Sequence, residues 1–235
     1  MDDLNKKIRE NLDGKYLFVY AHEFNEAIEW ALKNKIEQIQ IRGVAGRENS
    51  NTVSDFKEIE KLAPYLRKIS FAGLLDNAII NFDSIYSLKK LEKIYILCKQ
   101  KFSLDVSRFN LKHLGAEYWK GLKNIEKTET LESMVITKYP HENIRELLSL
   151  KNLKILHIYS SKIKTLEGIE KLNNLEELSL SRNNNLESIA EIKNIKLLNS
   201  FSIEKCKKIT DCAFVYEMEN IKRLYVNRFV KSGTL

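Results

Sequence analysis

Apolar residues recur along this chain at spacings that fit neither one long helix nor an isolated strand. The clearest unit opens with Leu153, Leu156 and Ile158, and the next unit opens at Leu175, 22 residues further on (175 − 153). Side chains two residues apart point to the same side of a strand. The apolar positions that follow, at 163, 166, 169 and 172, fit tight turns close to a 3₁₀-helix. Each unit is therefore predicted to be a strand with a tight return, enclosing an apolar interior.

The same opening recurs along most of the chain, as expected of a stack of repeats that share one core. The clear copies begin at Leu175 and Leu198. Weaker copies are Leu17/Val19, Ile36/Ile39/Ile41, Leu66/Ile69/Phe71, Leu91/Ile94/Ile96, Leu111/Leu114/Ala116, Leu131/Met134/Ile136 and Ile221/Leu224/Val226.

Asn183 and Cys206 follow the strands of two successive units at the same position. A buried side chain there can bond the backbone groups that are left unpaired where the chain leaves the strand. Both are therefore predicted to be structural turn residues. At the equivalent position of the other units stand Val44, Leu74, Trp119, Tyr139, Ser161 and Phe229. The early units are thus expected to be irregular.

This template resembles the leucine-rich repeat, and over residues 150–210 its spacing is similar to that of bacterial internalin-type repeats. The resemblance implies an α/β repeat solenoid, a horseshoe or arc with a parallel concave sheet and with helices and 3₁₀ turns on the convex side. We expect one domain over residues 1–235. Residues 1–35 would form an N-terminal cap and a first irregular repeat, 36–130 irregular repeats, and 131–235 regular repeats.

Three helices are expected near the N-terminus. Residues 23–34 place apolar side chains on one face at helical spacing. Ser54 or Asp55 could cap a second helix that buries Phe56, Ile59 and Leu62. Residues 1–11 are expected to add a short cap helix that uses Leu4, Ile8 and Leu12, because a terminal repeat exposes its core unless it is covered.

The composition favours a cytoplasmic protein. The N-terminus starts with acidic residues and has no apolar signal segment, and no apolar run is long enough to cross a bilayer. Three cysteines, Cys98, Cys206 and Cys212, suggest reduced thiols and not a disulfide framework. The net charge of +7 leaves nucleic-acid binding open as an alternative, but the lysines are scattered along the chain.

No catalytic, metal or cofactor site is predicted. His22, His113, His141 and His157 lack zinc-like spacing to one another or to the cysteines, and no glycine-rich phosphate motif or nucleophile motif occurs. Pairs such as Glu176–Glu177 are interpreted as solvated surface. His157 is expected in the middle of a strand, as a surface imidazole on a binding face.

The residues between the inward-pointing leucines should point outward and form rows across parallel strands. Tyrosine is a frequent interface anchor, and several tyrosines fall in or near these rows. The partner-binding residues are predicted to be Tyr95, Leu97, Glu117, Tyr118, His157, Tyr159, Glu204 and Tyr225.

These observations predict a non-catalytic protein-binding module that acts through its concave sheet, as a monomer or in a 1:1 complex, with no membrane partner. Architecture and size are similar to those of stand-alone cytoplasmic bacterial immunity proteins that neutralise toxins, including those of contact-dependent growth inhibition. That resemblance implies a toxin domain as the partner. The alternative is a nucleic-acid-associated scaffold that uses the basic surface.

Overall fold

The computed structural model describes residues 7–12, 14–43, 54–75 and 79–227. Their contacts divide the chain into two compact units. The first unit comprises residues 1–111 and 119–123, and the second comprises 112–118 and 124–235. The predicted single domain over 1–235 therefore stays a prediction, and each unit is described by itself.

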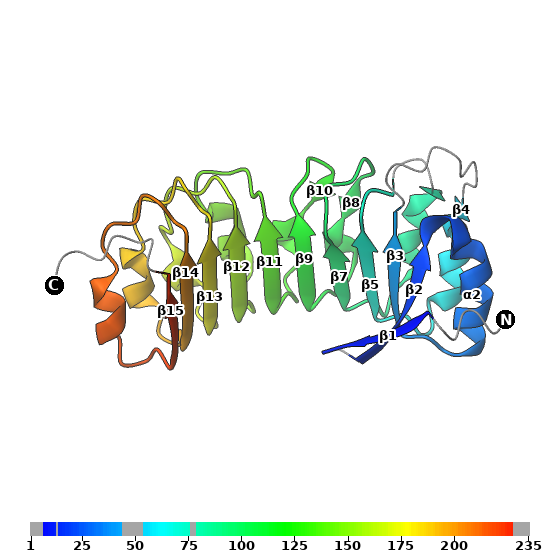
Figure 1. Ribbon diagram of the computed structural model, residues 1–235, viewed down its shortest axis with the longest axis horizontal. Coiled ribbons are helices and arrows are strands. Elements are labelled where there is room, and N and C mark those ends of the chain that lie inside the picture. Colours follow the sequence, from blue (N-terminus) through cyan, green and yellow to red (C-terminus); the bar gives the residue numbers. More distant parts are fainter. Residues whose placement is uncertain (1–6, 13, 44–53, 76–78, 228–235) are drawn as a thin grey trace. The chain divides into compact units, whose positions relative to one another are not determined.

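In the first unit, parallel strands alternate with helical connections (Figure 1). Its main sheet has β1 (Ile8–Asn11), β2 (Gly14–Tyr20), β3 (Gln38–Arg42), β5 (Lys68–Ala72) and β7 (Lys93–Ile96). The connections contain η1 (Ala21–Glu23), α2 (Phe24–Lys33), η2 (Phe56–Leu62), η4 (Phe82–Ser87) and η5 (Val106–Arg108). Two small parallel pairs join β4 (Ser54–Asp55) to β6 (Ile79–Ile80), and β8 (Leu104–Asp105) to β10 (Leu122–Lys123).

The predicted N-terminal cap helix is wrong for the described residues. Ile8–Asn11 is the strand β1, which pairs antiparallel with β2, and Leu12 is fully exposed. Leu4 lies outside the described residues. An antiparallel strand fits this place because it satisfies the backbone groups on the open edge of β2, which a helix would leave unpaired.

The helix predicted over 23–34 is confirmed as α2, which buries Phe24, Ala27, Ile28 and Ala31. The second predicted helix is η2, a 3₁₀-helix, whose N-cap Asp55 accepts a hydrogen bond from the backbone N–H of Lys57 at 2.9 Å. The tighter 3₁₀ form still buries one side chain per turn, namely Phe56, Ile59 and Leu62.

Aromatic rings from successive connections stack along the core of the first unit. Ring centroids are 5.0 Å apart for Phe24–Phe56, 5.2 Å for Phe56–Phe82 and 3.7 Å for Phe82–Phe102. Trp119 meets Phe102 edge-on at 6.0 Å, and its indole Nε1–H donates to the Phe102 carbonyl at 2.8 Å. Phe24 and Phe56 are buried and Phe82 and Phe102 are half-buried, so the stack runs from the core towards the surface.

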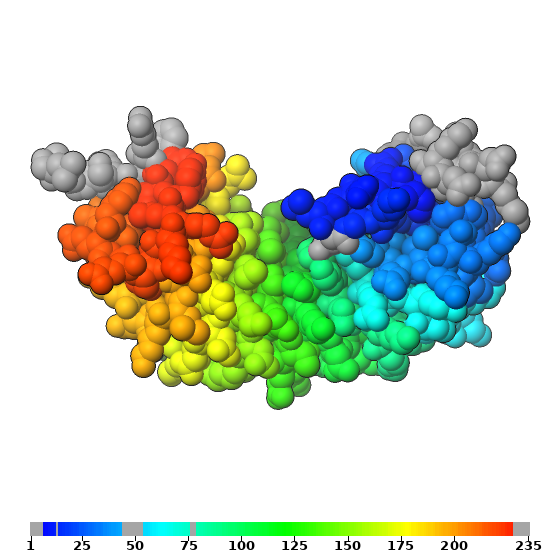
Figure 2. Space-filling model, turned by 90° about the horizontal axis from the view of Figure 1, so that it is seen from below, coloured from blue at the N-terminus to red at the C-terminus, as the bar shows by residue number. Residues whose placement is uncertain are grey.

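The second unit is a parallel sheet with 3₁₀-helical returns (Figure 1). Its strands are β9 (His113–Glu117), β11 (Ser133–Thr137), β12 (Ile155–Tyr159), β13 (Glu177–Ser181), β14 (Ser200–Glu204) and β15 (Arg223–Val226). Its returns contain η6 (Ile125–Lys127), η7 (Arg145–Ser149), η8 (Ile169–Lys171), η9 (Ala190–Asn194) and η10 (Ala213–Glu217). Repeats follow one another as bands in sequence order, from green to red in Figure 2. The predicted strand-and-return template is confirmed here.

The pairing of residues on adjacent strands follows the sequence repeat. Leu156 lies opposite Leu178, and Leu178 opposite Phe201, on adjacent parallel strands. All three side chains are buried, as are Ile158 and Leu180 two residues further along. Each five-residue strand therefore sends its second and fourth side chains into the core and its first, third and fifth outward.

Side chains at the turn position bond neighbouring repeats together. Asn183 is fully buried; its Oδ1 accepts from the Ser161 N–H at 2.9 Å, and its Nδ2 donates to the Ile158 carbonyl at 2.8 Å. One repeat earlier, Ser161 Oγ accepts from the Tyr139 N–H at 3.0 Å. One repeat later, the Cys206 thiol donates to the Leu180 carbonyl, with Sγ 3.9 Å from the oxygen. The serine at 161 thus continues the ladder of turn side chains.

In the first unit the turn position differs from the expectation. Leu74 is 36% exposed, and Leu75 is buried in its place. The buried Gln100 supplies the ladder bonds, because its Oε1 accepts from the Leu75 N–H and its Nε2 donates to the Gly73 carbonyl. Trp119 and Tyr139, two further residues at the turn position, are buried. Val44 and Phe229 lie outside the described residues.

Candidate functional site

The outward face of the second unit carries a connected set of polar and aromatic side chains. Strand β12 presents His157 and Tyr159, β13 presents Glu177 and Ser179, and β14 presents Ser202. They share this face because all occupy the first, third or fifth positions of their strands. His157 lies opposite Ser179, and Ser179 opposite Ser202, so the side chains form a row across the sheet.

A hydrogen-bond chain links these residues. His157 Nε2 and Glu177 Oε1 are 2.7 Å apart, and His157 Nδ1 and the Tyr159 hydroxyl are 3.1 Å apart. The Tyr159 hydroxyl also lies 3.2 Å from Ser179 Oγ, which accepts from the Ser202 hydroxyl at 2.6 Å. Glu177 uses its second oxygen to accept from Arg223 Nη2 at 3.1 Å. The rings of His157 and Tyr159 are thus each held by two hydrogen-bond contacts within the chain itself.

A hollow of about 400 Å³ opens beside this hydrogen-bond chain. It is lined by Thr137, Tyr159, Ser160, Ser179, Leu180, Ser181, Arg182, Ser202, Glu204 and Tyr225. Tyr225, at the end of the row in β15, is 55% exposed, so its ring forms an accessible wall. Hydroxyl groups and aromatic rings dominate the lining, which suits a mixed polar and apolar side chain of a partner.

Glu204 supplies a fixed negative charge to the lining. A hydrogen bond from the Lys205 ammonium holds the pKa of this carboxyl below its ordinary value against the smaller opposing effect of burial, and a hydrogen bond from Ser181 adds a still smaller lowering. Lys205 Nζ lies 2.9 Å from Glu204 Oε1. The charge is therefore present at neutral pH but is shared with a cation of the same repeat.

Hydrogen bonds on both sides fix the orientation of the His157 ring. Both ring nitrogens of His157 are engaged, one by the Glu177 carboxylate and one by the Tyr159 phenol. This hydrogen-bond chain therefore orients the Tyr159 ring. The hydroxyls of Ser179 and Ser202 are bonded to each other, and Ser179 is also bonded to the Tyr159 phenol.

The other predicted site residues of the second unit are dispersed around this cluster. Glu117, at the end of β9, pairs with Lys138 at 2.9 Å. Tyr118 lies beyond the strand, where its ring contacts those of Tyr139 and His141 at 6.1 and 6.2 Å. Burial, followed by the negative charges of Glu146 and Glu126, raises the pKa of Tyr118 above its ordinary value. Tyr118 therefore forms part of an aromatic group at the margin of the sheet.

Tyr95 and Leu97 belong to the first unit. Tyr95 is half-buried in β7, with the Lys68 ammonium 5.1 Å from its ring centroid. Leu97 follows the strand and is 61% exposed. Their grouping with His157 and Tyr159 as one centre stays a prediction.

Sequence reasoning missed one of the three outward rows. Apart from Tyr118, the predicted partner-binding residues stand one or three positions after the first inward side chain, whereas the strands begin one residue before that side chain and expose a third position. That row contains Ile155, Glu177, Ser200 and Arg223. Glu177 was interpreted as solvated surface, but it holds both His157 and Arg223. The polar residue just before the inward apolar residue in β13, β14 and β15 was the available signal.

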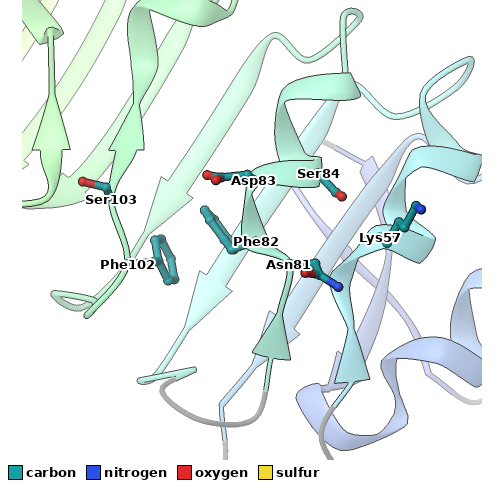
Figure 3. Close-up of a pocket in the computed structure, with 7 residues that line it drawn as sticks. All are labelled: Lys57, Asn81, Phe82, Asp83, Ser84, Phe102 and Ser103. Carbon is teal, nitrogen blue, oxygen red and sulfur yellow. The ribbon is translucent and has the colours of Figure 1, made fainter.

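A second hollow, of about 630 Å³, lies in the first unit beside the aromatic stack (Figure 3). The rings of Phe82 and Phe102 face each other there, while Asn81 is the N-cap residue of η4 and Ser84 lies within η4. Asn81 Nδ2 donates to Asp55 at 2.9 Å, and Ser84 Oγ donates to Glu60 at 2.8 Å. Asn81 and Ser84 are therefore already engaged by carboxylates of the first unit.

Metal binding and membrane insertion find no support in the described residues. Over 7–12, 14–43, 54–75 and 79–227, no three His, Cys, Asp or Glu side chains are grouped as metal ligands would be. The helices in that part of the chain are too short or too polar to cross a bilayer. Cys98, Cys206 and Cys212 are free thiols, and burial raises the pKa of the Cys206 thiol.

Comparison with known proteins supports the repeat assignment. Residues 151–196 match a family model described as leucine rich repeats (2 copies). These residues therefore carry leucine-rich repeats, as the sequence predicts. A comparison with curated proteins gives no match.

Two internalins of Listeria monocytogenes are similar in structure. For InlC2 the TM-score is 0.55 at 16% identity, covering 86% of this chain and 92% of that one. For InlF the TM-score is 0.51 at 15% identity, covering 82% of this chain and 67% of that one. At such identity the likeness concerns the fold, which is the leucine-rich-repeat fold that the sequence predicts.

Proposed function

We propose that this chain binds another protein through the outward face of its second unit. The observation that carries the proposal is the hydrogen-bonded row of His157, Tyr159 and Ser179 beside the hollow that Tyr225 borders. Parallel-sheet faces are ordinarily covered when they are apolar. This face instead combines accessible aromatic rings with hydroxyl groups, the composition that protein interfaces favour.

The side chains of this row are already fixed by hydrogen bonds, which supports the proposal that they bind a partner. Immobilising a side chain on binding costs roughly 0.5–1.5 kcal/mol, so a ring that is already fixed binds at lower entropic cost. Tyr159 is held by His157 and Ser179, and His157 is in turn held by Glu177. Tyr225 is 55% exposed, and among the described residues its hydroxyl has a long contact, from Asn227 Nδ2 at 3.5 Å. Tyr159 should therefore contribute more to affinity than Tyr225.

The finer proposal is that the partner is a toxin and the chain a bacterial immunity protein that acts in the cytoplasm. It is supported by the resemblance in architecture and size. The mechanism would be stoichiometric: the outward face covers the active site or the substrate-binding surface of the toxin. No catalytic step by this chain is required.

The binding proposal is tested on a partner recovered by affinity capture and identified. Tyr159→Ala should weaken its binding by about 1–3 kcal/mol, the usual cost of truncating an interface anchor, or roughly 5- to 150-fold in Kd. Lys171→Ala, in the 3₁₀-helix η8, should leave Kd unchanged and serves as the matched control. Equal affinity of both variants, measured by calorimetric titration, would place the interface elsewhere.

The toxin proposal needs its own experiment. The candidate toxin is the protein encoded next to this gene, co-expressed with wild type, Tyr159→Ala or Lys171→Ala. Survival with wild type and Lys171→Ala, but reduced survival with Tyr159→Ala, is expected. Protection by no variant removes the immunity role while leaving protein binding intact. Capture of nucleic acid alone, with affinity that falls steeply with salt, would instead favour the nucleic-acid scaffold.

A further inference from the structure

The phenol of Tyr159 stands between two hydrogen-bond partners. Its oxygen lies 3.1 Å from His157 Nδ1 on one side and 3.2 Å from Ser179 Oγ on the other. A phenol carries one hydrogen, so Tyr159 can donate to only one of these two atoms at a time. Which atom receives the hydrogen therefore depends on whether His157 Nδ1 itself carries a proton.

The contact with Glu177 decides where a neutral His157 ring carries its proton. An ionised carboxylate accepts hydrogen bonds and cannot donate them. Glu177 Oε1 lies 2.7 Å from His157 Nε2, so the single proton of a neutral ring is on Nε2. Nδ1 then accepts the hydrogen of Tyr159, and the phenol oxygen in turn accepts from the Ser179 hydroxyl.

Protonation of His157 reverses these bonds. Imidazole is the side-chain group that ordinarily gains a proton between about pH 5 and 8. A ring that takes up a second proton from solvent donates from Nδ1 to the phenol oxygen, and Tyr159 then donates to Ser179. Ser179 also accepts from the Ser202 hydroxyl at 2.6 Å, so its own hydrogen is released from the phenol. Because Ser179 lines the hollow, the hollow gains a hydrogen-bond donor.

Charged groups reach the His157 ring mainly from one side. Glu177 on β13 faces Nε2, and the other oxygen of this carboxylate accepts from Arg223 on β15. On the opposite side, the outward residues of β9 and β11 are His113, Gly115, Glu117, Ser133, Val135 and Thr137. The two ionisable residues of this set, His113 and Glu117, lie two strands away. An imidazolium at 157 is therefore paired with the Glu177 carboxylate.

The charges around the hollow favour a neutral acceptor on the partner. A hydrogen bond from Lys205 holds the pKa of the Glu204 carboxyl below its ordinary value, so this lining residue stays negative and repels a carboxylate. The exposed Arg182 is also in the lining, so a cation would meet positive charge from Arg182 and Lys205. A carbonyl oxygen has no net charge and accepts hydrogen bonds. The exposed ring of Tyr225 gives a flat amide group an apolar wall.

We propose that the hollow binds a carbonyl group of the protein partner, from a peptide bond or from an Asn or Gln side chain, and that protonation of His157 strengthens this contact by freeing the Ser179 hydroxyl to donate into the hollow. This inference rests on the proposed function in that the partner is a protein bound at this face. It adds the chemical group that the hollow receives and a dependence of binding on pH.

The test uses propionamide, which carries the carboxamide of a Gln side chain, and the full chain labelled with nitrogen-15. Nuclear magnetic resonance identifies a pH at which His157 carries one ring proton, expected on Nε2, and a lower pH at which it carries two. Both values are kept above about pH 5, where carboxyl groups stay ionised. The backbone signals of Ser179 and Tyr225 follow binding of the probe. Binding should tighten by about 2- to 12-fold at the lower pH, the usual effect of one additional hydrogen bond.

Two variants separate this switch from other effects of pH. Tyr159→Phe keeps the ring but has no hydroxyl to relay the change, so Ser179 is free of the phenol at both pH values. This variant should bind propionamide equally at both, about as tightly as wild type does at the lower pH. His141→Gln removes a histidine outside the row and should keep the wild-type pH dependence. Circular dichroism verifies that both variants are folded at both pH values.

Any of five results would overturn the proposal. They are a single His157 ring proton on Nδ1, no saturable binding of propionamide, equal affinity of wild type at the two pH values, unchanged pH dependence in Tyr159→Phe, or tighter binding of propionate or propylammonium. The titration of Tyr159→Ala against the captured partner tests the proposed function separately. If that complex is weakened while propionamide gives one of the five results, protein binding stands and this inference alone falls. The reverse pattern would remove the protein partner and leave the hollow as a pH-dependent site for small carbonyl compounds.

Discussion

At the scale of single residues, Asn183 shows how one side chain joins two repeats. It is fully buried and pairs the Ser161 N–H and the Ile158 carbonyl. Asn183→Ala should lower the free energy of unfolding by roughly 2–5 kcal/mol, because each buried group left unpaired costs about 1–3 kcal/mol. Urea denaturation measures the change, and Asn184→Ala, the same truncation at the exposed neighbouring position, is the control. Equal unfolding midpoints for the two variants would contradict a structural role for the ladder.

At the scale of elements, ion pairs join successive repeats. Lys154 Nζ lies 2.9 Å from Glu132, and Lys208 Nζ lies 2.8 Å from Glu187. These lysines hold the pKa of Glu132 and Glu187 below the ordinary value of 4.5. A carboxyl whose pKa is lower in the folded state stabilises the fold above its unfolded pKa, and this contribution is lost as pH falls through the folded value. Stability should therefore decline as pH falls below about 4.5, and less steeply in Glu132→Gln/Glu187→Gln. Urea titrations at several pH values measure the slope; equal slopes for wild type and variant would exclude these pairs as its source.

At the scale of the whole molecule, the question is whether the two units unfold together. Both tryptophans, Trp30 and Trp119, belong to the first unit, so their fluorescence reports that unit alone. Leu178, fully buried in β13, belongs to the second. Leu178→Ala should cost about 2–5 kcal/mol. If residues 1–235 form one cooperative domain, this substitution lowers the melting temperature seen by tryptophan fluorescence as well as by circular dichroism. A fluorescence transition that stays at the wild-type temperature would establish two independently folding units.

The sequence predicted the strands of the regular repeats closely because their signal is local and repeated. Leu178 and Leu180 alternate with polar residues within one strand, and the same spacing recurs one repeat later at Phe201 and Ile203. The partner-binding face could be predicted in part, since an inward leucine fixes the direction of its neighbours. His157 and Tyr159 were placed on that face by this argument alone.

Other features depended on contacts between residues far apart in the sequence. The sequence gives Glu177 no distinction from Glu176, yet strand register brings Glu177 to both His157 and Arg223. Gln100 acts at the turn only because it meets Leu75 and Gly73 in space. Residues 8–11 read as part of a helix until the open edge of β2 is considered.

The sequence by itself therefore determined the repeat, the leucine-rich-repeat fold and the direction in which most side chains of the regular strands point. Periodicity decides these because burial of an apolar stripe dominates the local free energy. Only the tertiary structure decided which polar residues form one hydrogen-bonded row. Such pairings depend on the register between strands some 20 residues apart, and register is set by the packing of the whole core.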